Sequence, residues 1–165
     1  MRKQDPIRVA LAGAGAFGIK HLDGIANIDG VEVVSVVGRL LDKTQAVADK
    51  YGIGHATTEL AESLALAEVD AVILCTPTQL HAQQAIDCLS AGKHVQVEIP
   101  LADSLADAQA VVKMQRETGL VAMCGHTRRF NPSHQWVNRR IQSGEFNLQD
   151  RKSTRLNSSH VRTSR

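Results

Sequence analysis

The amino-acid sequence predicts an α/β fold built on a doubly wound parallel sheet of the Rossmann type. Short runs rich in β-branched residues alternate with amphipathic segments over most of the 165 residues, as successive βαβ units do. A glycine-rich turn stands between the first of these runs and the helix that follows it. With 43% hydrophobic residues, the chain can bury the core that such a sheet requires.

The strands are predicted from short runs rich in β-branched and other apolar residues, a composition typical of buried parallel strands. We expect them at residues 7–12, 31–37, 71–74, 94–98 and 121–124.

The helices are predicted from apolar positions that repeat at helical spacing, at roughly 19–26, 43–51, 58–67, 79–91, 105–118 and 131–143. We expect Thr78 to cap the start of one helix and Ser104 with Asp107 to form a capping box. Gly52 and Gly92 are expected to end two others. In the helix after Ser104, one packed face is predicted to hold Leu105, Ala108, Val111 and Val112.

Composition excludes several protein classes. No apolar run approaches the ~20 residues that a membrane span needs, and the first six residues lack the apolar stretch of an export signal. The three cysteines, Cys75, Cys88 and Cys124, have no C-x-x-C spacing, so they indicate neither a disulfide framework nor a metal site. We therefore expect a cytoplasmic protein without a metal and without a membrane partner.

Residues 150–165 differ in composition from the rest of the chain, with five basic residues and one acidic residue. Such a tail is typical of a disordered arm that binds nucleic acid or another anionic surface. However, the run from Asp150 to His160 is also the in-frame translation of a widely used sequencing adapter. We therefore predict that 150–165 are an artefact and that the natural gene continues beyond about Gln149. Without them, 14 basic and 16 acidic residues leave a net charge of −2, which gives no reason to expect a nucleic-acid partner.

The glycine-rich turn has the spacing of a dinucleotide-binding loop. Gly13, Gly15 and Gly18 follow a predicted strand and open a predicted helix, the context that gives this spacing its meaning. In such loops the first glycine permits the turn, the second lets the backbone approach a pyrophosphate, and the third permits close packing of helix and strand. We expect residues 13–18 to bind the cofactor, with Ala14, Ala16 and Phe17 between the glycines. An ordinary structural turn and the glycine-rich loop of a methyltransferase are the alternatives.

The end of the second predicted strand favours NADP. NAD-binding proteins of this type carry an acid about 20 residues past the loop, but this chain has Gly38 and Arg39 there. A guanidinium can bind a 2′-phosphate through paired, charge-assisted hydrogen bonds. Arg39 could instead stack on adenine or lie free in solvent, and NAD remains possible.

Two further clusters follow later strands, where ligands bind in open α/β sheets. Thr76, Pro77 and Thr78 are predicted to line the nicotinamide side of the cofactor. His81 is either a cofactor contact or a structural histidine. Glu98 ends the next strand.

Three segments together resemble the Gfo/Idh/MocA oxidoreductases. They are the glycine loop, the C-T-P-T-x-x-H segment at 75–81, and an E-x-P turn at 98–100 followed by Leu101 and Ala102. Residues 5–149 resemble the nucleotide domain of that family along their whole length. The resemblance implies a nucleotide domain over 1–125, a connection over 126–149, and a C-terminal α/β substrate domain that is missing here. It also implies a homo-oligomer.

Ile99 departs from the family pattern. Most members have E-K-P, in which the lysine assists proton transfer at the substrate, and the side chain of Ile99 cannot ionise. The resemblance places Glu98 near the nicotinamide ribose, and a carboxylate held by backbone N–H groups is the alternative.

The segment after the last predicted strand contains the substrate candidates. Arg128 and Arg129 suit a dicarboxylate, because each guanidinium can hold one carboxylate bidentately. Asn131 is a third candidate contact, and His126 is a weak candidate for the general base. Alternatively, the two arginines pair with acids at a domain hinge.

Within this family, the sequence resembles a member that uses NADP to oxidise the cyclic hemiacetal of a dicarboxylated ring-cleavage product. The resemblance implies that a small dicarboxylate is the substrate and that the present chain alone is inactive. A sugar or inositol dehydrogenase of the same family, or a nucleotide-binding sensor without turnover, are the alternatives.

Overall fold

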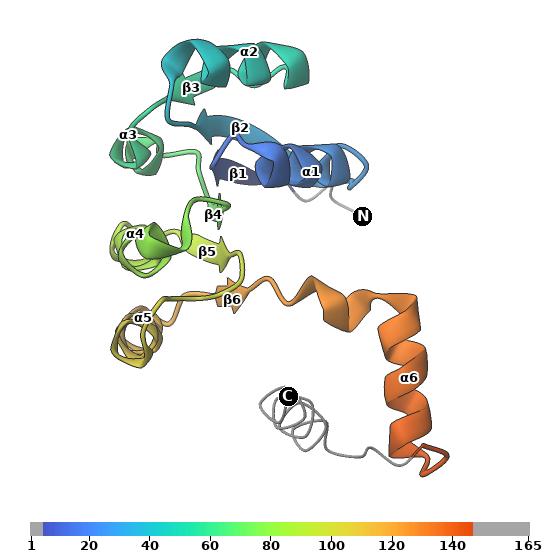
Figure 1. The fold of residues 1–165 in the computed structure, drawn as a ribbon. Helices are drawn as coiled ribbons and strands as arrows, with labels where there is room; N and C mark the ends of the chain where they lie inside the picture. Colours follow the sequence, from blue (N-terminus) through green and yellow to red (C-terminus); the bar gives the residue numbers. More distant parts are fainter. Residues whose placement is uncertain (1–4, 147–165) are drawn as a thin grey trace, which may run out of the picture. The chain divides into compact units, whose positions relative to one another are not determined.

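A six-stranded parallel sheet is the centre of the computed structural model, which describes residues 5–146 (Figure 1). Within these residues the strand order is β3-β2-β1-β4-β5-β6, so the order reverses between β1 and β4. This is the doubly wound topology that the sequence predicts. The strands are β1 (Ile7–Ala12), β2 (Val31–Val37), β3 (His55–Thr57), β4 (Ala71–Leu74), β5 (His94–Val97) and β6 (Ala122–Cys124).

Helices cover both faces of the sheet (Figure 1). One face carries α1 (Ala16–Ile25) and α2 (Leu41–Tyr51), and the other carries α3 (Leu60–Ala65), α4 (Thr78–Ser90) and α5 (Leu105–Thr118). Gly52 ends α2 with a φ of +68°, in the left-handed region, as the sequence predicts.

The core lies in two layers because successive side chains of a strand point to opposite faces. In β1, Leu11 packs with Leu22 of α1, whereas Ala10 and Ala12 pack with Leu89 of α4 in the other cluster. Both layers are buried, so β1 carries apolar residues on both faces.

The strand β3 was not predicted from the sequence, and the predicted start of the next helix is wrong. A helix was expected over 58–67, but His55–Thr57 pair with β2 and α3 begins only at Leu60. A polar contact fixes this arrangement. The Ser35 Oγ lies 2.8 Å from His55 Nδ1 and 2.7 Å from Ser63 Oγ, and this links β2 to both β3 and α3.

One predicted helix cap is wrong and a second is confirmed in part. Thr78 is the first residue of α4, and Pro77 is the N-cap. Ser104 does cap α5, because its Oγ accepts from the Asp107 backbone N–H at 3.1 Å. The Asp107 carboxylate accepts from the Ser104 hydroxyl at 2.7 Å, so the bond that would complete a capping box is replaced by a side-chain contact.

The predicted packed face of α5 is wrong in part. Val111 is buried at 1% exposure, but Leu105 is 75% and Val112 is 41% exposed. Met114 packs against the core instead, which shows that the buried stripe is rotated from the predicted one.

The chain divides after His126 into two compact units. The described part of the second unit holds a 3-10 turn at Thr127–Phe130 and α6 (Pro132–Gln142), within the predicted helix at 131–143. Trp136 of α6 meets Phe146 edge-on at 5.8 Å between ring centroids. The predicted artefact at 150–165 lies outside the described residues. Between residues 5 and 146, no helix has the length and apolarity to cross a membrane.

Candidate cofactor site

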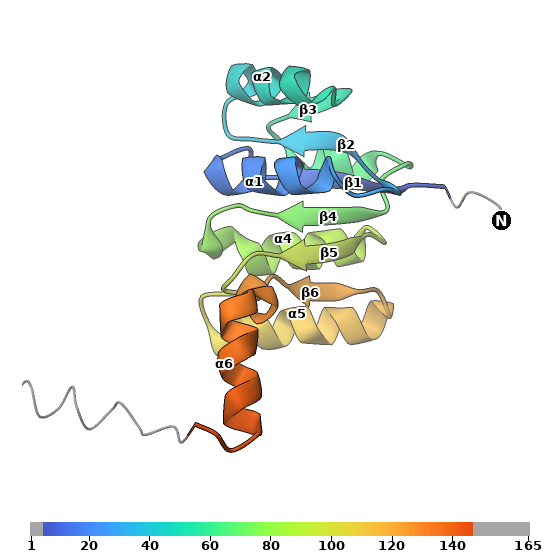
Figure 2. The same cartoon turned by 90° about the vertical axis from the view of Figure 1, so that its right-hand side faces the viewer.

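The ends of the strands are aligned across the sheet (Figure 2). The pairing joins Val37 to Ala12, Ala12 to Leu74, Leu74 to Val97, and Val97 to Cys124, the last residues of β2, β1, β4, β5 and β6. The residues that follow these strands therefore line one edge of the sheet. They are Gly13, Gly38, Cys75, Glu98 and Gly125.

Gly13 and Gly18 are required by the close approach of neighbouring backbone. Gly13 has a φ of +106°, and a Cβ there would overlap the carbonyl oxygen of Cys75. A Cβ at Gly18 would overlap the carbonyl oxygen of Gly13. The turn therefore packs tightly against both β4 and the start of α1.

Gly15 is different, because nothing lies within 4 Å of the position its Cβ would take. It is the N-cap of α1, which has no side-chain cap. The first backbone N–H groups of a helix attract anions through their free donors and the helix dipole. The open space at Gly15 therefore fits a pyrophosphate that approaches the backbone.

The end of β2 has no room for an acidic side chain at residue 38. A Cβ at Gly38 would overlap the Thr44 hydroxyl and lie 3.2 Å from the Ala14 Cβ. Arg39 is exposed and directly precedes Leu40, the N-cap of α2. The guanidinium therefore follows the strand at the point where NAD-binding proteins carry a carboxylate.

His81 joins the two loops that follow β4 and β5. Its ring is 2% exposed, with Nε2 lying 2.7 Å from the Thr76 carbonyl oxygen and Nδ1 lying 2.7 Å from that of Pro100. The Thr76 hydroxyl donates to Gln84 Oε1 at 2.5 Å. Each ring nitrogen of His81 therefore lies within hydrogen-bond distance of a backbone carbonyl oxygen.

Glu98 is buried and forms a close polar contact with a histidine that was not among the residues selected from the sequence. Its Oε1 lies 2.7 Å from Nε2 of His21 on α1. Its Oε2 accepts a longer hydrogen bond, 3.3 Å, from the backbone N–H of Ile99. Of the two alternatives for Glu98, a backbone N–H does contribute, but the shorter contact is with His21.

Two thiols lie near the Glu98 carboxylate. Burial raises the pKa of Cys75 to about 12, and the negative charge of Glu98 adds to the effect. Burial also raises the pKa of Cys124, again with a smaller contribution from Glu98. Neither thiol is a thiolate at neutral pH, so neither is a nucleophile here. Among the described residues, no group of three or more His, Cys, Asp or Glu side chains is placed to hold a metal ion.

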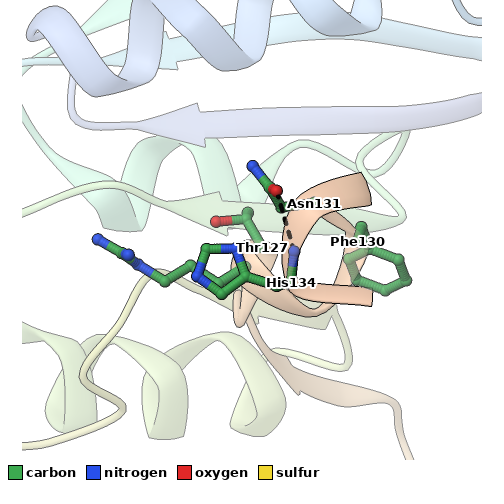
Figure 3. A pocket seen from close by; sticks show the side chains of 5 residues that line it. Thr127, Phe130, Asn131 and His134 are labelled. Carbon is green, nitrogen blue, oxygen red and sulfur yellow. Dashed lines mark hydrogen bonds between the residues drawn. The ribbon is translucent and has the colours of Figure 1, made fainter. Parts of the chain in front are cut away.

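The second unit contains an open pocket of about 530 Å³. Figure 3 shows Thr127, Phe130, Asn131 and His134 around it, and Arg128 completes the lining. Asn131 caps α6, because its Oδ1 accepts from the backbone N–H groups of Ser133 at 2.9 Å and His134 at 3.4 Å. Only its amide nitrogen is therefore left for a ligand.

The other candidates for substrate contact differ in whether they line this pocket. Arg128 lines the pocket of the second unit, whereas its neighbour Arg129 does not. His126 is exposed and is the last residue of the first unit. Among the described residues, the polar side chains that line the pocket are those of Thr127, Arg128, Asn131 and His134.

A family model described as "Oxidoreductase family, NAD-binding Rossmann fold" matches residues 7–126. The chain belongs to the Gfo/Idh/MocA oxidoreductase family. The match ends where the first compact unit ends, so the family's nucleotide-binding fold corresponds to the six-stranded unit.

Relatives in the Gfo/Idh/MocA family include enzymes with different substrates. The chain is 65% identical over 143 residues to 4-carboxy-2-hydroxymuconate-6-semialdehyde dehydrogenase of Sphingobium sp. (strain NBRC 103272 / SYK-6), and this covers 87% of the chain and 45% of that protein. It is 34% identical over 141 residues to scyllo-inositol 2-dehydrogenase (NAD(+)) of Bacillus subtilis (strain 168), which covers 85% and 41%. The chain thus spans less than half the length of these relatives.

Solved structures show the same fold. A 3-ketoreductase from Actinomadura kijaniata in complex with TDP-benzene and NADP has a TM-score of 0.79 and 28% sequence identity, over 85% of this chain and 44% of that chain. The cofactors named for these similar proteins thus include both NAD and NADP.

Two histidines of this Gfo/Idh/MocA chain, His21 and His134, were not among the residues selected from the sequence. His21 follows the last glycine of the loop by three residues, which places it one turn along α1. Its partner is 77 residues away, so local sequence gives no signal for the contact. His134 could have been found, since it lies one helical turn after Asn131.

Proposed function

We propose that this chain is the nucleotide-binding part of an NADP-dependent dehydrogenase. The full-length enzyme oxidises the cyclic hemiacetal of 4-carboxy-2-hydroxymuconate semialdehyde to 2-pyrone-4,6-dicarboxylate. The 65% identity to the Sphingobium dehydrogenase of that semialdehyde supports the substrate. The reaction turns the C–OH of the hemiacetal into a lactone carbonyl.

The roles of the cofactor residues follow from their places at the edge of the sheet. Gly13, Gly15 and Gly18 let the backbone at the start of α1 bind the pyrophosphate. Thr76–Thr78 and Glu98 orient the nicotinamide half. When bound, NADP supplies the chemistry by accepting a hydride from the ring carbon.

The preference for NADP depends on the end of β2. Because residue 38 is glycine, no carboxylate at this position repels a 2′-phosphate. An acidic side chain there would also overlap the Thr44 hydroxyl. Arg39 is exposed and free to bind that phosphate through charge-assisted hydrogen bonds.

The substrate side contains cationic groups and a histidine. Arg128 and Arg129 hold the carboxylates, and the Asn131 amide nitrogen donates a further hydrogen bond. The hydroxyl proton leaves as the hydride does, and His126 is the candidate base. Ile99 cannot take that proton, which distinguishes this chain from family members with a lysine there.

The remaining parts of the proposal concern the protein beyond this chain. We propose that the connection over 126–149 leads to an α/β substrate domain, that the full-length enzyme is a cytoplasmic homo-oligomer, and that the present chain alone is inactive. The proposal of a further domain is supported by the relatives' lengths, because the chain covers only 45% and 41% of the two relatives described above.

Recovering the uninterrupted gene tests the proposal. We expect an open reading frame that continues after Gln149, and a genuine stop after Arg165 would contradict the domain assignment. The enzyme from that gene should oxidise the hemiacetal much faster with NADP than with NAD, and Arg39→Ala should erase the preference. An unchanged preference in Arg39→Ala would remove Arg39 from the phosphate site, and no turnover of the hemiacetal would refute the substrate.

A further inference from the structure

The contact between His21 and Glu98 joins two parts of the candidate site that are far apart in the sequence. His21 lies on α1, the helix that begins at the glycine loop. Glu98 follows β5 and precedes Ile99 and Pro100. Their side chains meet at 2.7 Å between Nε2 and Oε1. One hydrogen-bonded pair therefore links the phosphate loop to the loop after β5.

This pair is shielded from water. The side chain of His21 is 18% exposed and that of Glu98 is 10% exposed. Within residues 5–146, no lysine or arginine forms an ion pair with Glu98. A buried carboxylate without its partner is strongly unfavourable, so His21 is the group that keeps Glu98 in one orientation.

Packing limits the freedom of both side chains. The ring of Phe17, one turn earlier on α1, lies 6.5 Å from that of His21 and is tilted by 48°. On the other side, Gly125 packs so closely on Glu98 that an added Cβ would lie 3.2 Å from Oε1. The pair thus has one well-defined geometry.

We propose that His21 is a positioning residue for the nicotinamide half of the cofactor, which it orients through Glu98. This inference rests on the proposed NADP function. His21 itself touches the carboxylate and acts through it. Because the adenosine half binds at Gly15 and Arg39, its affinity should not depend on the pair.

Two ligands separate positioning from a merely structural role. NADPH contains both halves of the cofactor, whereas adenosine 2′,5′-bisphosphate lacks the nicotinamide half. We expect His21→Gln to weaken NADPH binding by about tenfold, within the range measured for directly coupled side chains. Its affinity for adenosine 2′,5′-bisphosphate should stay within about twofold of the unmodified chain, a difference below the usual coupling energy.

The second variant and the control lie at opposite ends of β5, since Glu98 follows the strand and His94 begins it. Glu98→Gln should weaken NADPH binding by a similar factor, and the double variant should lose less than the product of the two single effects, because each removes the same contact. His94→Gln is the control, since His94 is exposed and begins β5 at the opposite edge of the sheet. It should change neither affinity.

Each outcome decides a different question. If His21→Gln weakens both ligands equally, or leaves NADPH binding unchanged, His21 is not a positioning residue for the nicotinamide half. Additive effects in the double variant would also refute the inference. If the unmodified chain binds neither ligand, the proposed cofactor function fails, and this inference fails with it.

Discussion

Replacing Gly15 with alanine should weaken cofactor binding strongly without disturbing the fold. The φ of Gly15 is −83°, which an alanine adopts freely, and nothing lies within 4 Å of the new Cβ. The methyl group would instead occupy the open space at the start of α1. In the proposed function, this is the space through which the pyrophosphate reaches the backbone.

The expected effect on stability is small because two contributions oppose each other. Alanine is a poorer N-cap than glycine by a few tenths of a kcal/mol or somewhat more. Against this, Gly→Ala at a compatible backbone lowers the entropy of the unfolded chain and stabilises by about 0.4–1 kcal/mol. The net change should stay within about 1 kcal/mol, or about 4 °C in Tm for a domain of this size.

The effect on binding should be much larger. Hydrogen bonds to a charged group contribute about 1.5–3 kcal/mol each, and the methyl group would block at least one between backbone and phosphate. We expect NADPH affinity to fall by at least about tenfold, measured by fluorescence titration beside thermal unfolding. Gly24→Ala in the same helix also meets nothing within 4 Å and should leave binding unchanged. Tight NADPH binding by Gly15→Ala would refute the phosphate site.

Three other predictions concern stability. Gly13→Ala should destabilise the fold by about 2–5 kcal/mol in urea unfolding, since the left-handed φ of +106° and the overlap with the Cys75 carbonyl both oppose a side chain; an unchanged midpoint would contradict the packing of this turn. Burial raises the pKa of Cys75 and of Cys88 to about 12, so the unfolded chain loses these protons first, and the free energy of unfolding should fall between about pH 8.5 and 12. Replacing both cysteines with alanine should flatten that decline, and an equally steep decline would exclude the thiols as its cause. Ser104→Ala removes the acceptor for the Asp107 N–H and should cost about 1 kcal/mol in the same urea assay, and no loss would show that α5 does not need this cap.

The parallel sheet could be predicted because its strands are marked locally. Residues 7–12, 31–37 and 71–74 are short runs rich in β-branched and other apolar residues, and the structure has strands at these positions. The strand at His55–Thr57 is too short to show a pattern, and it is fixed by a contact of His55 with Ser35, a residue of another strand. Such a strand depends on its neighbours and not on its own sequence.

Other features also divide into those that local sequence predicts and those that depend on the folded sheet. The glycine loop could be found from spacing, because its glycines lie together between a strand and a helix, although the backbone that crowds Gly13 belongs to the distant Cys75. The rotated face of α5 could not, since Leu105 and Val112 satisfy helical periodicity but lie away from the core. The pair of His21 and Glu98 depends on the alignment of α1 with the end of β5, which only the folded sheet provides.

The most direct test of NADP binding at this site is a titration of the chain with NADPH and NADH under identical salt conditions. Arg39 should bind the 2′-phosphate that only NADPH carries, and a charge-assisted hydrogen bond of about 1.5–3 kcal/mol corresponds to roughly a tenfold to hundredfold preference. We expect NADPH to bind more tightly by that factor. Equal affinities, or tighter binding of NADH, would contradict the assignment of this site to NADP.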